Sequence, residues 1–141
     1  MSTANEWNER NKAVIEEFRA NKGQTDGPLI TRPLLLLHTT GAKSGLARVN
    51  PLVYMADDDR YVIIASKGGA ATHPDWYHNL VAHTEVDVEV GAEQFQAQAT
   101  IAEEPERSQL YERMATEHPF FAEYQRQTKR TIPVIILTRK G

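Results

Sequence analysis

The 141-residue sequence contains no cysteine, so it forms no disulfide, carries no thiolate nucleophile and builds no sulfur-ligated metal site. Long apolar runs are also missing. The longest, at 34–37 and 134–137, fall far short of the roughly 20 residues that a membrane-spanning helix needs. These absences exclude thiol redox chemistry and predict a chain that does not cross a bilayer.

Neither sign of charge dominates. The chain has 16 Lys and Arg against 19 Asp and Glu, mixed along its whole length, for a formal net charge of -3. Without a basic stripe to face a phosphate backbone, a nucleic-acid partner is not expected. The polar stretch 1–11 lacks the apolar region and cleavage site of a secretory signal, so we expect a cytoplasmic protein.

The first segment with a clear periodicity runs from Asn5 to Ala20. Its apolar residues recur at helical spacing and its end is marked by Lys22-Gly23, which predicts an amphipathic helix and linker over 1–27 before one domain over 28–141. The polar face mixes Glu with Arg and Lys, so it lacks the cationic bias of membrane-surface helices. Packing on the domain is therefore favoured, while transient contact with the inner face of the membrane stays open.

The rest of the chain is dominated by short strand-like segments. We predict strands over 34–39, 48–55, 61–66, 85–90, 95–101 and 132–138. The clearest pattern is the alternation of valine with acidic residues over 85–90, which continues beyond Gly91 as a hairpin. Pro133 implies a strand start or an edge position.

A helical pair is expected over 105–129, because Pro105 suits a first helical turn and apolar residues follow at helical spacing. Five or six short strands with few helices predict an α+β, mainly β fold. A closed or split barrel is favoured over a doubly wound sheet.

The segment Thr39–Gly45, Thr-Thr-Gly-Ala-Lys-Ser-Gly, joins two predicted strands. Glycines let such a turn present backbone N–H groups to an anion, and Lys43 and Arg48 add the charge that a phosphate or carboxylate seeks. A Walker loop is excluded, because Ala42 rather than glycine precedes Lys43 and no helical pattern follows. The segment is either an anion-binding turn or a plain hairpin turn.

A second glycine-containing loop, Ser66-Lys67-Gly68-Gly69, ends the third predicted strand. Two glycines permit close backbone approach to a planar ligand, while the serine offers a donor and an acceptor and the lysine a charge. Trp76 and Tyr77 follow, which predicts a flat aromatic surface as well as a core contact. The alternative is a flexible loop with one solvated lysine.

Three histidines, at 73, 78 and 83, repeat every five residues. On a helix, five residues turn through about 500°, so successive rings point roughly 140° apart and do not share one ion. No metal is expected. His118, Phe121 and Tyr124 share one face of a helix, which forms either a pocket lid or a core-facing stripe.

Five motifs occur in order along the chain. They are Thr-Thr-Gly-Ala-Lys-Ser-Gly at 39–45, Arg-Val-Asn-Pro-Leu at 48–52, Ala-Ser-Lys-Gly-Gly at 65–69, His-Pro-Asp-Trp-Tyr-His-Asn-Leu at 73–80 and Arg-Thr-Ile-Pro-Val at 130–134. Together they resemble the deazaflavin-dependent nitroreductase family. The resemblance covers about 34–137 and implies a split β-barrel and a reductase of the F420H2-dependent quinone reductase type, with coenzyme F420 as cofactor.

The resemblance also implies roles for individual residues. It implies that Lys43 and Arg48 hold the phosphate and glutamate tail of the cofactor. It implies that the deazaflavin is lined by Pro51, Ser66, Lys67, Gly68, Gly69, Trp76 and Asn79. The charge of a groove that includes Lys67 agrees in kind with a tail that carries a phosphodiester and carboxylates.

A deazaflavin reaction is expected to be a two-electron hydride transfer to a conjugated acceptor, to which a proton must also be delivered. Ser66, Tyr124, His118 or a bound water is the candidate donor, with Ser66 and Tyr124 expected nearest the acceptor. Positions that are tyrosine-rich in the nitroimidazole-activating family member are Val53, His118 and Phe121 here. A quinone is therefore favoured over a nitro compound.

Two other functions fit the same sequence. One is an FMN-dependent oxidoreductase on the same split barrel, whose shorter cofactor would not need a long basic groove. The other is a non-catalytic F420-binding carrier, which turnover would distinguish from an enzyme. Split barrels of this kind often pair, so a homodimer is expected by analogy of fold alone.

Overall fold

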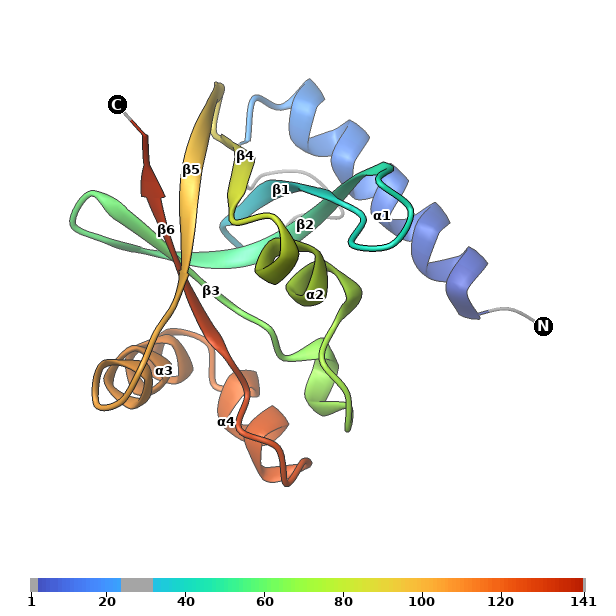
Figure 1. The fold of residues 1–141 in the computed structure, drawn as a ribbon. Coiled ribbons are helices and arrows are strands. Elements are labelled where there is room, and N and C mark those ends of the chain that lie inside the picture. The colour runs from blue at the N-terminus through green and yellow to red at the C-terminus, as the bar shows by residue number, and fades with distance from the viewer. Residues whose placement is uncertain (1–2, 24–31, 141) are drawn as a thin grey trace.

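The computed structural model describes residues 3–23 and 32–140, and side chains from residue 11 onward within them. Six antiparallel strands close into one barrel in the order β1-β2-β3-β6-β5-β4 (Figure 1). The strands are β1 (Leu34–Thr40), β2 (Ala47–Asp57), β3 (Arg60–Ile64), β4 (Glu85–Val90), β5 (Glu93–Ile101) and β6 (Val134–Arg139). The predicted barrel and all six predicted strands are confirmed.

Over the described residues, four α-helices and one 3-10 turn surround the barrel (Figure 1). They are α1 (Thr3–Ala20), η1 (Lys67–Gly69), α2 (Asp75–Ala82), α3 (Glu106–Glu117) and α4 (Phe120–Arg126). The N-terminal helix and the helical pair are confirmed, whereas α2 was not predicted. No helix in the described part of the chain is long and apolar enough to cross a membrane.

The barrel interior is filled by alternate residues of the strands. The valines of β4 that were predicted to alternate, Val86 and Val88, face inward and pack with Leu35 and Leu37 of β1. Pro133 lies immediately before β6, which pairs with β3 on one side and β5 on the other. Of the two alternatives for Pro133, the strand start is therefore the right one.

A second apolar cluster lies outside the barrel, beneath α3 and α4. It joins Met55 of β2 and Val62 of β3 to Met114 of α3 and Phe121 of α4. The predicted apolar stripe of the helical pair is thus buried against one outer face of the sheet.

Helix α1 packs on another outer face, as favoured from its mixed polar surface. Val14 and Phe18, 7% and 1% exposed, contact Leu36 of β1. Arg19 donates to Glu89 of β4 at 2.8 and 3.2 Å. The predicted boundary between residues 27 and 28 lies outside the described residues.

Strand β2 is the longest strand and pairs differently along its two halves. Residues 47–53 pair with β1, whereas residues 54–57 pair with β3. Before Tyr54, the backbone of β2 therefore pairs with β1 on one side and with no strand of the described residues on the other.

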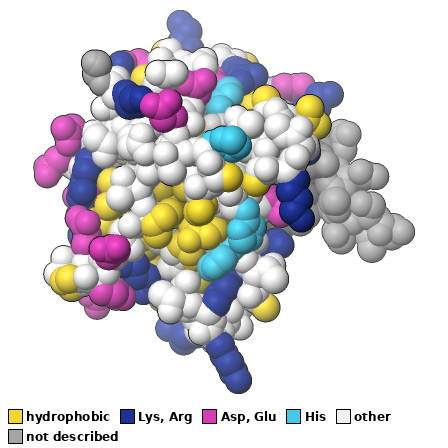
Figure 2. Space-filling model, in the orientation of Figure 1, with side chains coloured by type: hydrophobic (Ala, Val, Ile, Leu, Met, Phe, Trp, Pro, Cys, Tyr) yellow, Lys and Arg dark blue, Asp and Glu magenta, His cyan; other side chains and the backbone are white. Residues whose placement is uncertain are grey.

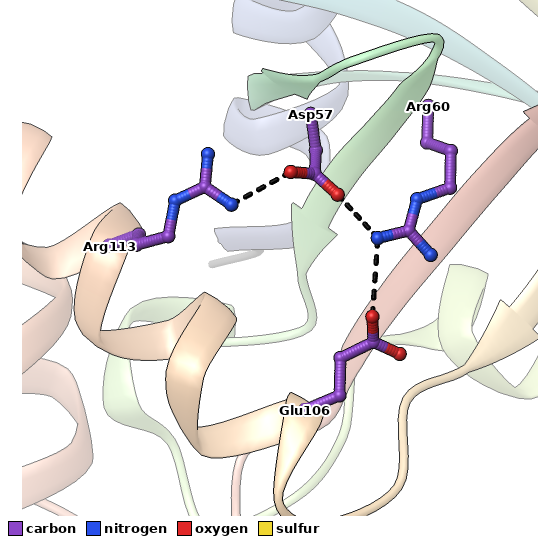
Figure 3. Close-up of polar contacts among 4 residues, drawn as sticks. All are labelled: Asp57, Arg60, Glu106 and Arg113. Carbon is purple, nitrogen blue, oxygen red and sulfur yellow. Dashed lines mark hydrogen bonds and ion pairs between the residues drawn. The ribbon is translucent and has the colours of Figure 1, made fainter.

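The turn between β2 and β3 is tied to α3 by charged side chains (Figure 3). Asp57 accepts from Arg113 of α3 at 2.8 Å and from Arg60 of β3, and Arg60 also donates to Glu106 at 3.2 Å. Both arginines hold the pKa of the Asp57 carboxyl below its usual 3.8, with the hydrogen bond from Arg113 the largest cause.

Candidate functional site

The loop after β3 carries the Ser66–Gly69 motif in a strained conformation. Lys67, Gly68 and Gly69 have φ angles of 49°, 63° and 83°, in the left-handed region that a lysine rarely adopts. A Cβ on Gly69 would lie 2.9 Å from the Tyr124 carbonyl oxygen, whereas one on Gly68 would meet no atom within 4 Å. The loop therefore packs tightly on α4 through Gly69 and leaves Gly68 open to a ligand.

Polar groups in this loop are only partly free. The amide of Gly69 donates to the Ser66 carbonyl at 3.0 Å, and the Lys67 ammonium donates to Thr72 at 3.2 Å. The first contact leaves the Gly69 amide unavailable to a ligand, although the loop can still be approached closely. The Ser66 side chain, on a residue only 9% exposed, has no hydrogen-bond partner within the described residues.

Arg130, for which the sequence predicted no role beyond its place in the motif at 130–134, binds this loop from the far end of the chain. Its Nε donates to the Ala70 carbonyl at 2.8 Å and its Nη2 to the Ser66 carbonyl at 2.7 Å. Its Nη1 reaches the Ala65 carbonyl at 3.2 Å and His73 Nδ1 at 2.9 Å. No local sequence signal reveals these contacts, because three of the four acceptors are backbone groups.

Helix α4 and the end of α3 bring an aromatic surface against the same loop. The His118 and Phe121 rings lie 6.2 Å apart, and the Phe121 and Tyr124 rings 6.0 Å apart. Phe121 is buried and Val53 of β2 packs on the same cluster, so four predicted positions from three segments do come together. Tyr124 is half-buried and, like His118, has no side-chain hydrogen bond in the described chain.

The Thr39–Gly45 turn is closed by its own hydrogen bonds. The amide of Gly41 donates to the Leu46 carbonyl at 2.8 Å, that of Gly45 to the Gly41 carbonyl at 2.9 Å, and that of Ala42 to Asn79 Oδ1 at 2.9 Å. These three amides are therefore not available to an anion, which an anion-binding turn would need, whereas a plain hairpin turn would not. Any anion here would be held mainly by side chains.

Two cations remain available on that turn and its strand. Lys43 and Arg48 are both exposed, and neither has an ion-pair partner within residues 11–23 and 32–140. Asn79 of α2 holds the turn from below, because its Nδ2 also donates to Thr39 Oγ1 at 3.3 Å. Both ends of the Asn79 amide are thus engaged, which makes it a residue that positions the turn.

Pro51 and Trp76 occupy different environments. Pro51 lies opposite Leu36 in the half of β2 whose other side is unpaired. Trp76 is 6% exposed and packs in the barrel interior with Leu80. Of the two expected roles of Trp76, the core contact is present and little of the indole is left for a ligand.

His73 precedes α2 and does not share a helix with the other two histidines, so the helical argument against a shared ion does not apply to it. Its ring lies 5.9 Å from that of His78 and 4.7 Å from that of Tyr77. Burial, then the charge of Arg130, lowers its pKa below the usual 6.5. In the described part of the chain, no group of three or more His, Asp and Glu is placed to hold a metal.

A groove of about 410 Å³ lies beside His73 and Tyr77, between the end of β5 and the start of β6. On this face Figure 2 shows hydrophobic side chains with histidines beside them. None of the predicted site residues lines the groove. The candidate site is therefore the rim on which those residues lie, running from the β1–β2 turn through α2 and η1 to α4 (Figure 1).

A closed six-stranded barrel with a glycine loop, free cations and hydroxyl groups on one rim defines a split-barrel protein with a candidate site for an anionic, ring-containing cofactor. The chain belongs to the F420H(2)-dependent quinone reductase family, whose model it matches over residues 10–139. It is 41% identical over 111 residues to the F420H(2)-dependent quinone reductase Rv1261c of Mycobacterium tuberculosis, covering 77% of this chain and 74% of that protein.

The chain is also similar to solved structures. An F420-H2 dependent reductase, FDR-A, is 40% identical with a TM-score of 0.69, covering 75% of this chain and 94% of that one. A domain-swapped dimer is 35% identical with a TM-score of 0.71, covering 96% and 99%. A pyridoxamine 5'-phosphate oxidase-like protein of Listeria innocua, 9% identical, shares the fold alone, with a TM-score of 0.57 and coverage of 92% and 90%.

Proposed function

We propose that this protein is an F420H2-dependent reductase that transfers a hydride from the reduced deazaflavin to a quinone. The observation that carries the proposal is its membership of the F420H(2)-dependent quinone reductase family over almost the whole chain. Coenzyme F420, when bound, supplies the hydride, and the protein supplies binding, orientation and a proton.

The residues on the rim fit such a cofactor. Its acidic tail needs cations that are not already neutralised, and Lys43 and Arg48 are exposed and unpaired among the described side chains. Its flat ring system needs a surface that it can approach closely, which the open side of Gly68 offers. Lys43 and Arg48 would therefore hold the tail, and Pro51 and 66–69 would line the ring.

The acceptor side is best supplied by the aromatic surface of α4. Val53, Phe121 and Tyr124 form one apolar wall, which suits a quinone ring. A quinone that receives a hydride needs a proton at its oxygen. The side chains of Ser66, Tyr124 and His118 can donate a proton, and none of them has a hydrogen-bond partner among the described residues. We assign Ser66 and Tyr124 as the principal donors and His118 as the third candidate.

The test is an anaerobic titration of the protein with F420H2 and, separately, with FMN, followed by addition of menadione while the deazaflavin absorbance is monitored. Tight F420H2 binding with quinone-dependent reoxidation is expected, and Lys43→Ala should weaken binding. Binding of FMN alone would overturn the cofactor assignment. Binding of F420H2 with no turnover across several quinones and enones would instead identify a carrier.

Two further features belong to this proposal. A homodimer is supported by the relative that forms a domain-swapped dimer. Measurement of the molar mass in solution by light scattering would test it.

Transient contact with a membrane would give access to a lipid-soluble quinone. Co-sedimentation with anionic vesicles would test it, and recovery of all the protein in the supernatant would contradict it.

A further inference from the structure

The loop after β3 has a shape that its own backbone does not favour. Three consecutive residues, Lys67 to Gly69, have positive φ angles, and one of them is a lysine with a Cβ. Such a conformation persists only where surrounding groups impose it. The contact of Gly69 with α4 restrains one side of the loop, so the other side needs a second restraint.

Arg130 supplies that restraint. Its three nitrogens bind the carbonyls at both ends of the strained segment, those of Ala65 and Ser66 before it and that of Ala70 after it. The planar guanidinium presents its N–H groups in a fixed fork, so these carbonyls are held at set positions relative to one another. An ammonium at the same place would offer three donors from a single atom and would not span them.

The same guanidinium also fixes His73. An arginine only donates, so His73 Nδ1 at 2.9 Å must accept, and the proton of the neutral ring is then on Nε2. The segment from residue 65 to residue 73 is thereby bound to one side chain at four points. That side chain lies just before β6, whose pairing with β3 anchors it to the barrel.

We propose that Arg130 is a positioning residue for the cofactor ring, holding Ser66 and Gly68 where the deazaflavin and its acceptor meet them. The inference rests on the proposed function, since it assigns a role within that site. Arg130 acts through the loop and needs no contact with substrate. Its loss should therefore displace the loop and alter hydride transfer beyond any change in stability.

The test compares Arg130→Lys and Arg130→Gln with the matched variant Arg60→Lys. Arg60 lies at the start of β3 and, like Arg130, is half-buried. It makes two side-chain hydrogen bonds, to the carboxylates of Asp57 and Glu106, and none to the loop. Each variant is assayed for its unfolding midpoint, F420H2 dissociation constant and single-turnover hydride transfer to menadione.

Both Arg130 variants should slow single-turnover hydride transfer by roughly tenfold to a hundredfold, the loss expected from a site displaced by about 1 Å. The lysine should not rescue the rate, because it keeps the charge and loses the fork. Arg60→Lys should stay within about twofold of wild type on the same scale. Equal rates in Arg130→Lys and Arg60→Lys would overturn the proposal.

A measurement without cofactor separates this proposal from the proposed function. The amides of Gly69 and Ala70 donate to carbonyls inside the loop, so their hydrogen exchange reports loop order directly. Exchange at both should be slower in wild type than at Gly45, whose amide closes the exposed β1–β2 turn, and should accelerate in Arg130→Lys.

Fast exchange at Gly69 and Ala70 in wild type would overturn the role of Arg130 even if F420H2 binds. Slow exchange in a protein that binds no F420H2 would instead contradict the proposed function.

Discussion

The two ends of strand β3 are each bound by an arginine, and they differ in what that arginine contacts. At the start of the strand, Arg60 binds the carboxylates of Asp57 and Glu106 (Figure 3). Beyond its end, Arg130 binds three neutral carbonyls and a neutral imidazole. The first arrangement joins two elements by charge, whereas the second holds a loop in one shape by geometry.

The difference separates a structural network from a site-forming one. Opposite charges attract over a range of directions, so the Asp57 network tolerates small movements of α3. Hydrogen bonds to carbonyls weaken steeply when the angle changes, so the Arg130 contacts specify the loop much more narrowly. A cofactor that must lie within a fraction of an ångström of its acceptor needs the second kind of support.

The largest effect is expected from Gly69→Ala in the loop. The new methyl group would lie 2.9 Å from the Tyr124 carbonyl and from Gln127 Oε1, at a φ of +83°. We expect a loss of about 2 to 4 kcal/mol in the free energy of unfolding, from left-handed strain and overpacking together. Denaturant unfolding checks it.

Gly68→Ala is the matched control for that change. Gly68 also has a positive φ, +63°, but an added methyl group would meet no atom within 4 Å. Only the strain remains, so the expected loss is about 1 to 2 kcal/mol. Equal losses in the two variants would mean that the packing of the loop on α4 does not restrain it.

The next largest loss of stability is expected at the start of β3, where Asp57 binds Arg60 and Arg113. Asp57→Asn keeps the shape of the side chain and removes the charge that faces Arg60 and Arg113. Because both arginines are partly exposed, we expect a loss of about 1 to 2 kcal/mol in the free energy of unfolding. The exposed neighbour Asp59 serves as a control, and Asp59→Asn should stay within about 0.5 kcal/mol of wild type.

The two ends should also respond to acid at different pH. The pKa of His73 is lowered in the fold, so the unfolded chain binds that proton more readily and the contribution of the neutral ring is lost as pH falls below the ordinary 6.5. The pKa of Asp57 is lowered as well, so its contribution is complete above 3.8 and is lost only as pH falls through the lower folded value.

Two variants, His73→Gln and Asp57→Asn, measure the pH ranges over which these two contributions to stability are lost. The stability difference between wild type and His73→Gln should narrow between about pH 7.5 and about pH 5.5, while that between wild type and Asp57→Asn stays constant there. The second difference should shrink only below about pH 4. A His73→Gln difference that is flat across the first window would show that the ring does not titrate against Arg130.

How much of this was predictable depends on whether the contacts are local. The alternation of Val86 and Val88 with acidic residues predicts the hairpin directly, because strand burial has a period of two. Helix α2 was missed because its eight residues bury only Trp76 and Leu80, too few to define a helical period.

The residues of the proposed site, which stay predictions, could be chosen from the sequence, whereas the contacts that restrain them could not. Ser66, Tyr124 and His118 were recognisable because a polar group beside glycine or aromatic residues is a local signal. The role of Arg130 was not, because its acceptors are 57 to 65 residues away and are mostly backbone carbonyls that every sequence contains. Asn79 was missed as the support of the β1–β2 turn for the same reason.

The smallest expected effect separates the two arginines by salt. Raising NaCl from about 0.05 M to about 1 M shortens the Debye length to roughly 3 Å, so the stability difference between wild type and Asp57→Asn should narrow by about 0.5 kcal/mol. The difference between wild type and Arg130→Lys should not change, because both side chains carry the same charge and the carbonyl acceptors carry none. If both differences narrowed equally, charge rather than fork geometry would hold the loop, and the contrast between the two ends of β3 would be lost.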